Sequence, residues 1–455
     1  MIIKNLNIVI LAAGKGTRMQ SVIPKVLHRL AGKPLLAHVI DAAKTLNPSK
    51  MVVVYGYGGD AVPNAFTHED ITWVEQKEQL GTGHAMLQAV PHLDDDGTTL
   101  ILLGDVPLLN LQSCMSLLEK PEALGLLTVS KQNPTGYGRI VRNHQQLILA
   151  IVEHKDATDT QKAITEVNTG IIAVNNKNLN AWLSKLSNHN AQGEYYLTDI
   201  VAMAVNDGLN VSAEITYDEA SVEGVNSKAD LASLERVYQT RYAASLMQAG
   251  ATLADPNRID VRGSLTVGKD VEIDVGCVFE GKVALGDGVR IGPYCVIKES
   301  SIGAESEIAA FTHIDQARVE SGCRIGPYAR LRPGAEIADE AHVGNFVEIK
   351  NSQVGSNSKV NHLSYIGDAT IGKNVNIGAG TITCNYDGVN KYKTVIEDDV
   401  FIGSDTQLVA PVVIGEGATI AAGSTITKNA PAGQLTICRA KDQKSIAGWK
   451  RPIKK

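Results

Sequence analysis

Aliphatic residues recur at every sixth position through the second half of the chain. The spacing is unbroken from Ile396 to Ile426, and it also runs through most of residues 267–377. An α-helix would show a period of about 3.6 residues and a simple strand a period of two. A six-residue period is typical of hexapeptide β-helices. The sequence therefore predicts a parallel β-helix with three walls, whose aliphatic side chains point into a triangular prism.

Four steps of five residues interrupt the period, and we interpret them as corners that are one residue shorter. They fall at 297→302, 314→319, 349→354 and 366→371. Coils stack about 4.8 Å apart, so residues 267–430 have room for about nine coils and a prism roughly 40 Å long. The period fails at residues 384–393, a polar insertion that we expect to project as a loop. Loops on rigid scaffolds are where functional residues concentrate.

Composition limits the class of protein. The chain has 455 residues, enough for two or three domains, and a net charge of −6, which gives no strong attraction to nucleic acid or membranes. Its six cysteines show no C-x-x-C spacing, which argues against zinc and fits a reducing, cytoplasmic compartment. No run of 18 apolar residues exists, so we expect no membrane-spanning segment. A solvated terminus or an anion-binding segment would each explain the basic tail residues Lys450, Arg451, Lys454 and Lys455.

The first half has a different pattern, in which apolar runs alternate with stretches of helical character. Runs at residues 7–13, 51–55, 100–103 and 171–174 predict a mainly parallel α/β sheet. Ligands of such sheets bind at the carboxyl ends of the strands. Residues 227–249 lack Gly and Pro and predict one long helix that ends at Gly250. This helix is either a rigid arm between domains or, in its first half, a helix packed within one domain.

The loop after the first predicted strand has the composition of a phosphate-binding loop. Gly14 and Gly16 let backbone N–H groups approach a phosphate, and Arg18 and Lys25 supply positive charge. Its spacing matches neither a Walker A motif nor the dinucleotide G-x-G-x-x-G motif, so neither an ATPase nor a dehydrogenase is favoured. Instead, L-A-A-G-K-G-T-R-M with Pro24-Lys25 resembles the signature of sugar-nucleotide pyrophosphorylases.

Further segments of the first half carry ligand-binding chemistry. Gln76 precedes a Gly-Thr-Gly turn, and its amide can read a pyrimidine edge, although a polar loop before a helix explains it equally well. Asp105 follows the run at 100–103 and, with the amide oxygen of Asn226, suits Mg²⁺, while a helix N-cap is the alternative for Asp105. Polar groups suited to sugar hydroxyls occur at residues 136–140, 153–156 and 168–170, although each of these segments alone is more often a turn.

Residues that lie off the aliphatic period mark candidate binding positions in the second half. A β-helix needs no His, Lys or Arg at fixed places, so these departures carry the functional information, although any one of them is more often part of a solvated face. They are Arg332, Lys350, His362, Tyr365, Asn376, Ala379, Ser404 and Ala422.

Together, these motifs resemble the GlmU family of bacterial enzymes. Members join an N-acetylglucosamine-1-phosphate uridylyltransferase to a glucosamine-1-phosphate N-acetyltransferase. The resemblance covers essentially the whole chain and is most specific in G-A-G-T-I-T-C-N-Y-D-G at residues 378–388. It implies an α/β, Rossmann-like nucleotidyltransferase domain at 1–228, a helical linker at 229–249 and a left-handed parallel β-helix domain at 250–455. It also implies Mg²⁺, a cytoplasmic homotrimer, and synthesis of UDP-N-acetylglucosamine for peptidoglycan and lipopolysaccharide.

The resemblance also assigns roles at the uridylyltransferase site. It implies that Asp105 and Asn226 hold Mg²⁺, and that Arg18 and Lys25 stabilise the transferring and leaving phosphates. It further implies nucleotide and sugar contacts from Leu11, Ala12, Ala13, Gly14, Gln76, Gly81, Thr82, Leu103, Gly104, Gly138, Glu153 and Asn168.

At the acetyltransferase site, the resemblance implies that His362 is the general base for the glucosamine amine. Arg332 and Lys350 would hold the sugar phosphate, with Tyr365 and Asn376 orienting the ring. Acetyl-CoA would be bound between neighbouring subunits by Ala379, Asn385, Tyr386, Ser404, Ala422 and Arg439, and the Ala379 N–H would stabilise the oxyanion.

Two other functions stay open from the sequence. One is a sugar-nucleotide pyrophosphorylase whose β-helix serves only assembly or regulation, and His362 with the 384–393 loop argues against it. The other is a structural prism joined to a relic nucleotide-binding domain, which UTP-dependent release of pyrophosphate would exclude.

Overall fold

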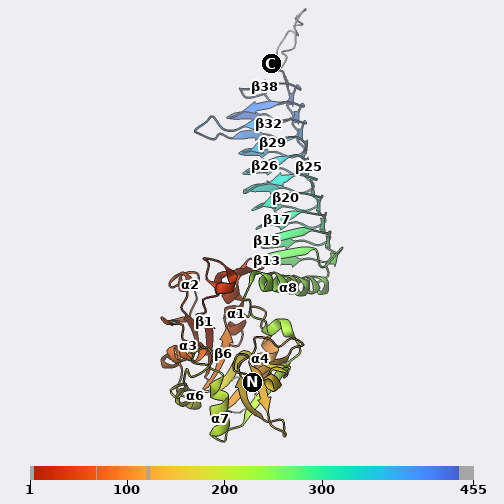
Figure 1. The fold of residues 1–455 in the computed structure, drawn as a ribbon. Helices are drawn as coiled ribbons and strands as arrows, with labels where there is room; N and C mark the ends of the chain where they lie inside the picture. The colour runs from red at the N-terminus through yellow and green to blue at the C-terminus, as the bar shows by residue number, and fades with distance from the viewer. Residues whose placement is uncertain (1–4, 68, 120–122, 440–455) are drawn as a thin grey trace, which may run out of the picture. The chain divides into compact units, whose positions relative to one another are not determined.

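The computed structural model describes residues 5–67, 69–119 and 123–439 (Figure 1). The chain divides into two compact units, Met1–Tyr238 and Gln239–Lys455. The basic residues of the C-terminal tail, Lys450 to Lys455, lie outside the described residues. The domain boundaries expected at 228 and 250 remain predictions.

Within the described residues, the first unit is built on a nine-stranded sheet. Its main path runs β11-β7-β10-β6-β1-β4-β5, with β8 paired to β10 and β9 paired to β8. All pairings along the main path are parallel except the two made by β10, so the predicted mainly parallel sheet is confirmed and the run at 171–174 is its antiparallel member. The strands are β1 Leu6–Ala12, β4 Lys50–Tyr55, β5 Thr72–Glu75, β6 Thr98–Leu103, β7 Leu124–Ser130, β8 Arg139–Arg142, β9 Ile148–Val152, β10 Glu166–Asn175 and β11 Val211–Thr216; a separate hairpin joins β2 Arg29–Leu30 and β3 Lys33–Pro34.

Helices cover both faces of this sheet because alternate side chains of each strand point to opposite faces. From β1, Val9 and Leu11 pack in one core, and Ile8 and Ile10 pack in the other. The first core includes residues of α3, α6 and α7, and the second includes residues of α1 and α4. The helices are α1 Leu35–Lys44, α2 Ala61–Asn64, α3 Thr82–Ala89, α4 Leu111–Leu118, α5 Asp159–Lys162, α6 Asn176–Leu183 and α7 Asp199–Asn206, with short 3₁₀ turns η1 Thr17–Met19, η2 Lys25–Leu27, η3 Val90–His92 and η4 Glu219–Val222.

The second unit contains the predicted stack of short parallel strands (Figure 1). In its described part, an 11-stranded sheet forms one wall, and a 17-stranded sheet turns a corner and supplies the other two. The first wall contains β12 Thr252–Leu253, β14 Glu272–Ile273, β16 Arg290–Ile291, β19 Glu307–Ile308, β22 Arg324–Ile325, β25 His342–Asn345, β28 Lys359–His362, β31 Asn376–Ile377, β34 Phe401–Ile402, β37 Thr419–Ile420 and β39 Leu435–Thr436. The other two contain β13 Ile259–Val267, β15 Cys277–Leu285, β17 Val296–Lys298, β18 Ser301–Ile302, β20 His313–Asp315, β21 Arg318–Val319, β23 Arg330–Leu331, β24 Ala335–Ile337, β26 Glu348–Lys350, β27 Ser352–Val354, β29 Tyr365–Gly367, β30 Ala369–Ile371, β32 Ile382–Cys384, β33 Thr394–Ile396, β35 Gln407–Val409, β36 Val412–Ile414 and β38 Thr425–Ile426.

Strand register explains the six-residue period and its interruptions. Ile273 pairs with Ile291, a coil of 18 residues, whereas Ile291 pairs with Ile308, a coil of 17. Their side chains are buried in the core of the prism, as predicted. At each of the four five-residue steps, one residue with a φ of 43–48° turns the shortened corner: Glu299, Gln316, Asn351 and Asp368.

A polar residue fills the interior next to the inserted loop. Thr383 is fully buried at the position where the period calls for an aliphatic side chain. Its hydroxyl accepts a hydrogen bond from Gly367 N at 2.7 Å and donates to Gly367 O at 3.0 Å. The hydroxyl is therefore satisfied, which removes most of the cost of burying it.

Helix α8, Lys228–Gln248, occupies the segment predicted to be one long helix. In the first unit, Leu234 packs with Met19 and Val225. In the second unit, Gln239 exchanges two hydrogen bonds with the backbone of Val261, at 2.8 and 2.9 Å. The two parts of the helix therefore belong to different cores.

Candidate functional sites

Three predicted residues of the first unit converge at the end of β6. The Lys25 ammonium forms an ion pair with Asp105 and lies 3.5 Å from Asn226 Oδ1. Asn226 donates its amide hydrogen to Gly224 O at 3.3 Å, which leaves Oδ1 facing the ammonium. Both charged side chains are mostly buried, with 14% and 16% of Lys25 and Asp105 exposed. A carboxylate and an amide oxygen thus face one cation, and this donor set fits Mg²⁺.

The loop after β1 contributes to the same strand end. Gly104 N donates to Leu11 O at 2.9 Å, which holds the segments 11–14 and 103–105 side by side. Gly16 has a φ of 58°, and a Cβ there would lie 2.7 Å from Lys25 Cβ, so glycine is needed for Lys25 to pack against the loop. Arg18 is exposed on η1, and within the described residues it makes no ion pair. The structure therefore assembles Lys25, but not Arg18, with Asp105.

The predicted base-binding residues are joined by a hydrogen bond. Gln76, directly after β5, is only 2% exposed and donates from Nε2 to Gly81 O at 3.1 Å. Gly81 has a φ of 109° and lies against the Tyr195 backbone, where a Cβ would come within 2.6 Å of Tyr195 O. Thr82 accepts a hydrogen bond from Leu197 N at 3.1 Å, so its hydroxyl oxygen stabilises the turn.

The three predicted sugar-binding residues also lie together. Asn168 N donates to Gly138 O at 2.9 Å, and a Cβ on Gly138 would lie 3.3 Å from Glu153 Oε1. Thr198 donates to Glu153 Oε1 at 3.0 Å. Burial raises the pKa of Glu153, and nearby carboxylates, Asp199 first among them, add to the rise. Such a carboxyl group is suited to hydrogen bonding with a sugar hydroxyl in a partly dehydrated site.

A charged network that the sequence interpretation missed supports this region. One Glu223 oxygen accepts from the Tyr137 hydroxyl at 2.7 Å, and the other pairs with Lys131 at 2.6 Å. The Lys131 ammonium also lies 5.1 Å from the centroid of the Tyr137 ring. Burial and the bond to Glu223 raise the pKa of Tyr137, so its phenol stays protonated. The network connects the residue before Gly138 to the segment that carries Asn226.

In the second unit, His362 lies at the end of β28 with one ring nitrogen engaged. Its Nδ1 is 2.7 Å from Asn345 Oδ1, one coil away. An amide oxygen only accepts, so Nδ1 carries the proton and the lone pair lies on Nε2. Gly380 N donates to His362 O at 3.2 Å, which places the Ala379-Gly380 turn on the adjacent coil. Within the described residues, the Ala379 N–H has no acceptor.

The predicted phosphate-binding cations occupy neighbouring coils of the 17-stranded sheet. Arg332, after β23, pairs with Glu348 at 2.8 Å, and Lys350 ends β26. Tyr365 begins β29 and is the register partner of Glu348. The predicted ring contact Asn376 is on β31 of the other sheet, in register with Lys359. These residues are therefore spread around a corner of the prism.

The predicted acetyl-CoA contacts form a column on successive coils. Asp405 N donates to Ala379 O at 2.7 Å, and Gly423 N donates to Ser404 O at 2.8 Å. Arg439 extends the column by donating to Ala422 O at 2.9 Å. The hexapeptide stacking thus aligns four residues that are distant in sequence.

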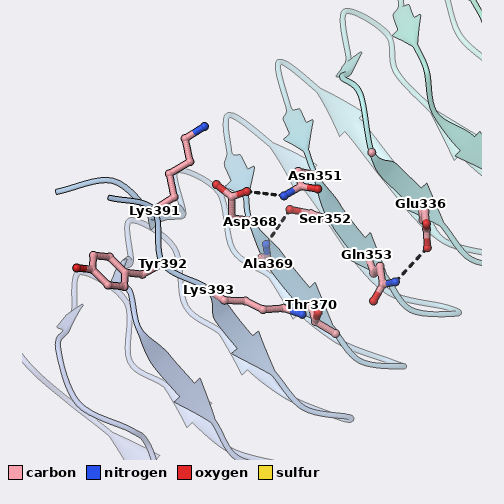
Figure 2. Close-up of a pocket in the computed structure, with 11 residues that line it drawn as sticks. Glu336, Asn351, Ser352, Gln353, Asp368, Ala369, Thr370, Lys391, Tyr392 and Lys393 are labelled. Carbon is pink, nitrogen blue, oxygen red and sulfur yellow. Dashed lines mark hydrogen bonds between the residues drawn. The ribbon is translucent and has the colours of Figure 1, made fainter. Parts of the chain in front are cut away.

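The inserted loop differs from the expectation in one respect. Tyr386 is 60% exposed, as expected for a projecting loop, but Asn385 is 7% exposed and donates to Asp368 at the base of the loop. A cavity of about 420 Å³ lies beside this base, with Asp368 and Lys391 among its lining residues (Figure 2). The Lys350 ammonium lowers the pKa of Lys391. The sequence interpretation did not identify Lys391.

Two further statements hold for the part of the chain that the structure describes. No cluster of three or more His, Cys, Asp or Glu side chains is arranged to hold a metal ion. None of the helices described is both long and apolar enough to span a bilayer.

Comparison with known proteins shows the same division of the chain. The MobA-like NTP transferase domain family matches residues 8–166, and the bacterial transferase hexapeptide (six repeats) family matches residues 265–299 and 393–428. The chain is 68% identical to the bifunctional protein GlmU of Methylobacillus flagellatus, covering 99% of this chain and 98% of that protein. It is 58% identical to that of Herminiimonas arsenicoxydans and 57% identical to that of Nitrosospira multiformis, with 99% of this chain covered in both and 99% and 98% of those proteins.

Proposed function

Because the chain belongs to the GlmU family of bifunctional enzymes, which make UDP-N-acetylglucosamine, we propose that each unit performs one of the two transfers at the residues described above. The first unit transfers uridylyl from UTP, and the second transfers acetyl from acetyl-CoA. The observation that carries this assignment is the similarity to bifunctional relatives over 99% of the chain, which includes both clusters of polar residues.

At the first cluster, a phosphate oxygen of N-acetylglucosamine-1-phosphate attacks the α-phosphorus of UTP. The bond from that phosphorus to pyrophosphate breaks. The attacking oxygen is already anionic, so catalysis depends on positioning and charge neutralisation. Lys25 and Arg18 neutralise the phosphates, Gln76 and Gly81 hold the base, and the carboxyl of Glu153 holds the sugar.

We assign Asp105 and Asn226 as the residues that would hold Mg²⁺. Their oxygens face the single Lys25 ammonium, which supports a site built for positive charge. When bound, the ion supplies neutralisation of phosphate charge. With Asp105 holding the ion, Lys25 would be free to pair with a substrate phosphate.

At the second cluster, the amine of glucosamine-1-phosphate attacks the thioester carbonyl of acetyl-CoA. His362 takes the amine proton on Nε2, the atom left with a lone pair by the bond to Asn345. The Ala379 N–H stabilises the oxyanion, which collapses as the thiolate leaves. Arg332, Lys350 and Lys391 neutralise the sugar phosphate. The coenzyme is bound by Tyr386 and by the column of residues Ala379, Ser404, Ala422 and Arg439.

We also propose that the protein is a cytoplasmic homotrimer with acetyltransferase sites between neighbouring prisms. Support comes from an exposed ladder of aromatic rings, whose centroids are 5.0 to 5.4 Å apart and whose side chains are 46–55% exposed. Such contiguous apolar surface is typical of interaction sites. The ladder consists of Tyr294, Phe311, Tyr328 and Phe346. Sedimentation should give a mass near three times 48.5 kDa.

One reconstitution tests both activities. Purified protein, glucosamine-1-phosphate, acetyl-CoA, UTP and Mg²⁺ should yield UDP-N-acetylglucosamine and pyrophosphate by mass analysis. Without UTP, N-acetylglucosamine-1-phosphate should accumulate. Absence of thioester consumption, with UTP turnover retained when N-acetylglucosamine-1-phosphate is supplied, would instead identify a pyrophosphorylase with a structural prism.

A further inference from the structure

We propose that His84 is a positioning residue that makes the nucleotide site select UTP over CTP. It does so by fixing the orientation of the Gln76 side-chain amide. This inference rests on the proposed function, in which Gln76 contacts the base. His84 lies in the first turn of α3, directly after the Gly-Thr-Gly turn at residues 81–83, and the proposed reaction gives it no role.

The two ends of the Gln76 amide have different surroundings. Its Nε2 lies 3.1 Å from Gly81 O and 3.0 Å from His84 Nδ1. A carbonyl oxygen only accepts, so the contact with Gly81 identifies the nitrogen end of the amide. Both amide hydrogens therefore have acceptors inside the protein. Among the described residues, none donates to Gln76 Oε1, which is the end left for a ligand.

This arrangement also determines the tautomer of the His84 imidazole. To accept from Gln76, His84 Nδ1 must carry its lone pair, so the proton of the neutral ring is on Nε2. The ring lies against Tyr195, with centroids 6.4 Å apart. Gln88 donates to His84 O at 3.3 Å, and its Nε2 lies 3.4 Å from the ring Nε2. In this tautomer both of those nitrogens carry hydrogen, so the second contact is not a hydrogen bond, and the ring is confined by its packing between α3 and Tyr195.

The consequence is a hydrogen-bond acceptor presented to the base. Uracil carries a donor at N3, whereas cytosine carries a lone pair there. An acceptor opposite N3 therefore pairs with uracil and repels cytosine. Gly81 N and Thr82 N have no acceptor among the described residues and are suited to the flanking carbonyl oxygens of uracil. A site with buried groups of fixed polarity rejects a ligand that leaves them unpaired.

Removing the acceptor at His84 should weaken this selection. His84→Phe keeps an aromatic ring but leaves one hydrogen of the Gln76 amide buried without an acceptor. The opposite orientation of the Gln76 amide, with its oxygen and nitrogen exchanged, then becomes more populated. In His84→Asn, an oxygen replaces Nδ1 and can still accept from Gln76. The second variant is therefore the matched control for the first.

The test is kcat/KM for UTP and for CTP in wild type and both variants, with N-acetylglucosamine-1-phosphate and Mg²⁺. We expect His84→Phe to lower the UTP to CTP ratio about tenfold, and His84→Asn to retain most of it. Equal losses for both nucleotides in His84→Phe, at unchanged thermal stability, would overturn the proposal. If wild type showed no preference for UTP, the proposed uridylyltransferase function itself would fail.

Discussion

The two units place their polar residues together by different means. In the first unit, Lys25 meets Asp105, 80 residues later, and Asn226, 201 residues later, because parallel strands bring distant loops to one edge of a sheet. In the prism, Asn345 meets His362 at a separation of 17, and Arg332 meets Glu348 at 16. Neighbours in the prism follow from coil length, whereas neighbours in the sheet follow from topology. Spatial neighbours can therefore be read from the sequence where it repeats, as in the prism, but not where sheet topology brings distant loops together.

The difference extends to stability. Each coil of the prism contacts mainly the coils above and below it, so its stability is close to a sum of local terms. Strand β1 instead lies between β4 and β6 and sends side chains into two cores. We expect a destabilising substitution in the prism to affect mainly the neighbouring coils, and one in the sheet to lower the stability of the whole first unit. Four substitutions test this comparison, from the largest expected effect to the smallest.

Asp105→Ala should lower uridylyl transfer by about 10⁴-fold, because a metal ion supplies several kcal/mol of charge stabilisation. Acetyl transfer by the same preparation should stay near the wild-type rate. Pyrophosphate release and thioester consumption measure the two reactions separately. Asp95→Ala, at an exposed aspartate of the same unit, is the control. Loss of both reactions in a folded variant would refute the assignment of one transfer to each unit.

His362→Ala should lower acetyl transfer by about 10²- to 10⁴-fold, the usual range for losing a general base. Uridylyl transfer to supplied N-acetylglucosamine-1-phosphate should be retained. His313→Ala, at another prism histidine on β20, should have little effect. Near-normal acetyl turnover in His362→Ala would remove this residue from the role of base.

Tyr137→Phe should lower kcat/KM for uridylyl transfer about tenfold, since a hydrogen bond to a charged group contributes about 1.5–3 kcal/mol, part of which affects only stability. The reason is that Glu223 loses one of its two partners, and the segment leading to Asn226 is held less firmly. Steady-state kinetics at varied Mg²⁺ should show an increased metal requirement. Tyr217→Phe, whose side chain is 94% exposed, provides the comparison. An unchanged metal requirement would contradict the positioning role.

Ile325→Ala should leave both activities nearly unchanged while destabilising the prism by about 2–5 kcal/mol, the cost of truncating a buried isoleucine. Hydrogen exchange followed by mass spectrometry should show faster exchange mainly in the coils around residues 308–343. The equivalent change in the sheet, Ile10→Ala, should accelerate exchange across several strands. Exchange that spreads through the whole prism would contradict the local model of its stability.

Much of the prism and part of the first site were predictable from particular residues. The steps 297→302 and 314→319 indicated short corners, and the register confirms coils of 17 residues there. The sequence also predicted a mainly parallel sheet, which the pairing confirms. It did not indicate that Lys131 and Glu223 join Tyr137, because charged residues far apart on loops carry no period. Nor did it separate Asn385, buried against Asp368, from the exposed Tyr386.

The sequence by itself determined the prism, because a six-residue period can be buried only by winding the chain so that every sixth side chain points inwards. It also determined the glycine-rich loop after β1, since close backbone approach requires glycine there. Only the tertiary structure decided that Lys25 pairs with Asp105 while Arg18 stays exposed, and that His84 lies within hydrogen-bond distance of the Gln76 amide. Those contacts depend on where loops meet in space, which no local spacing in the chain encodes.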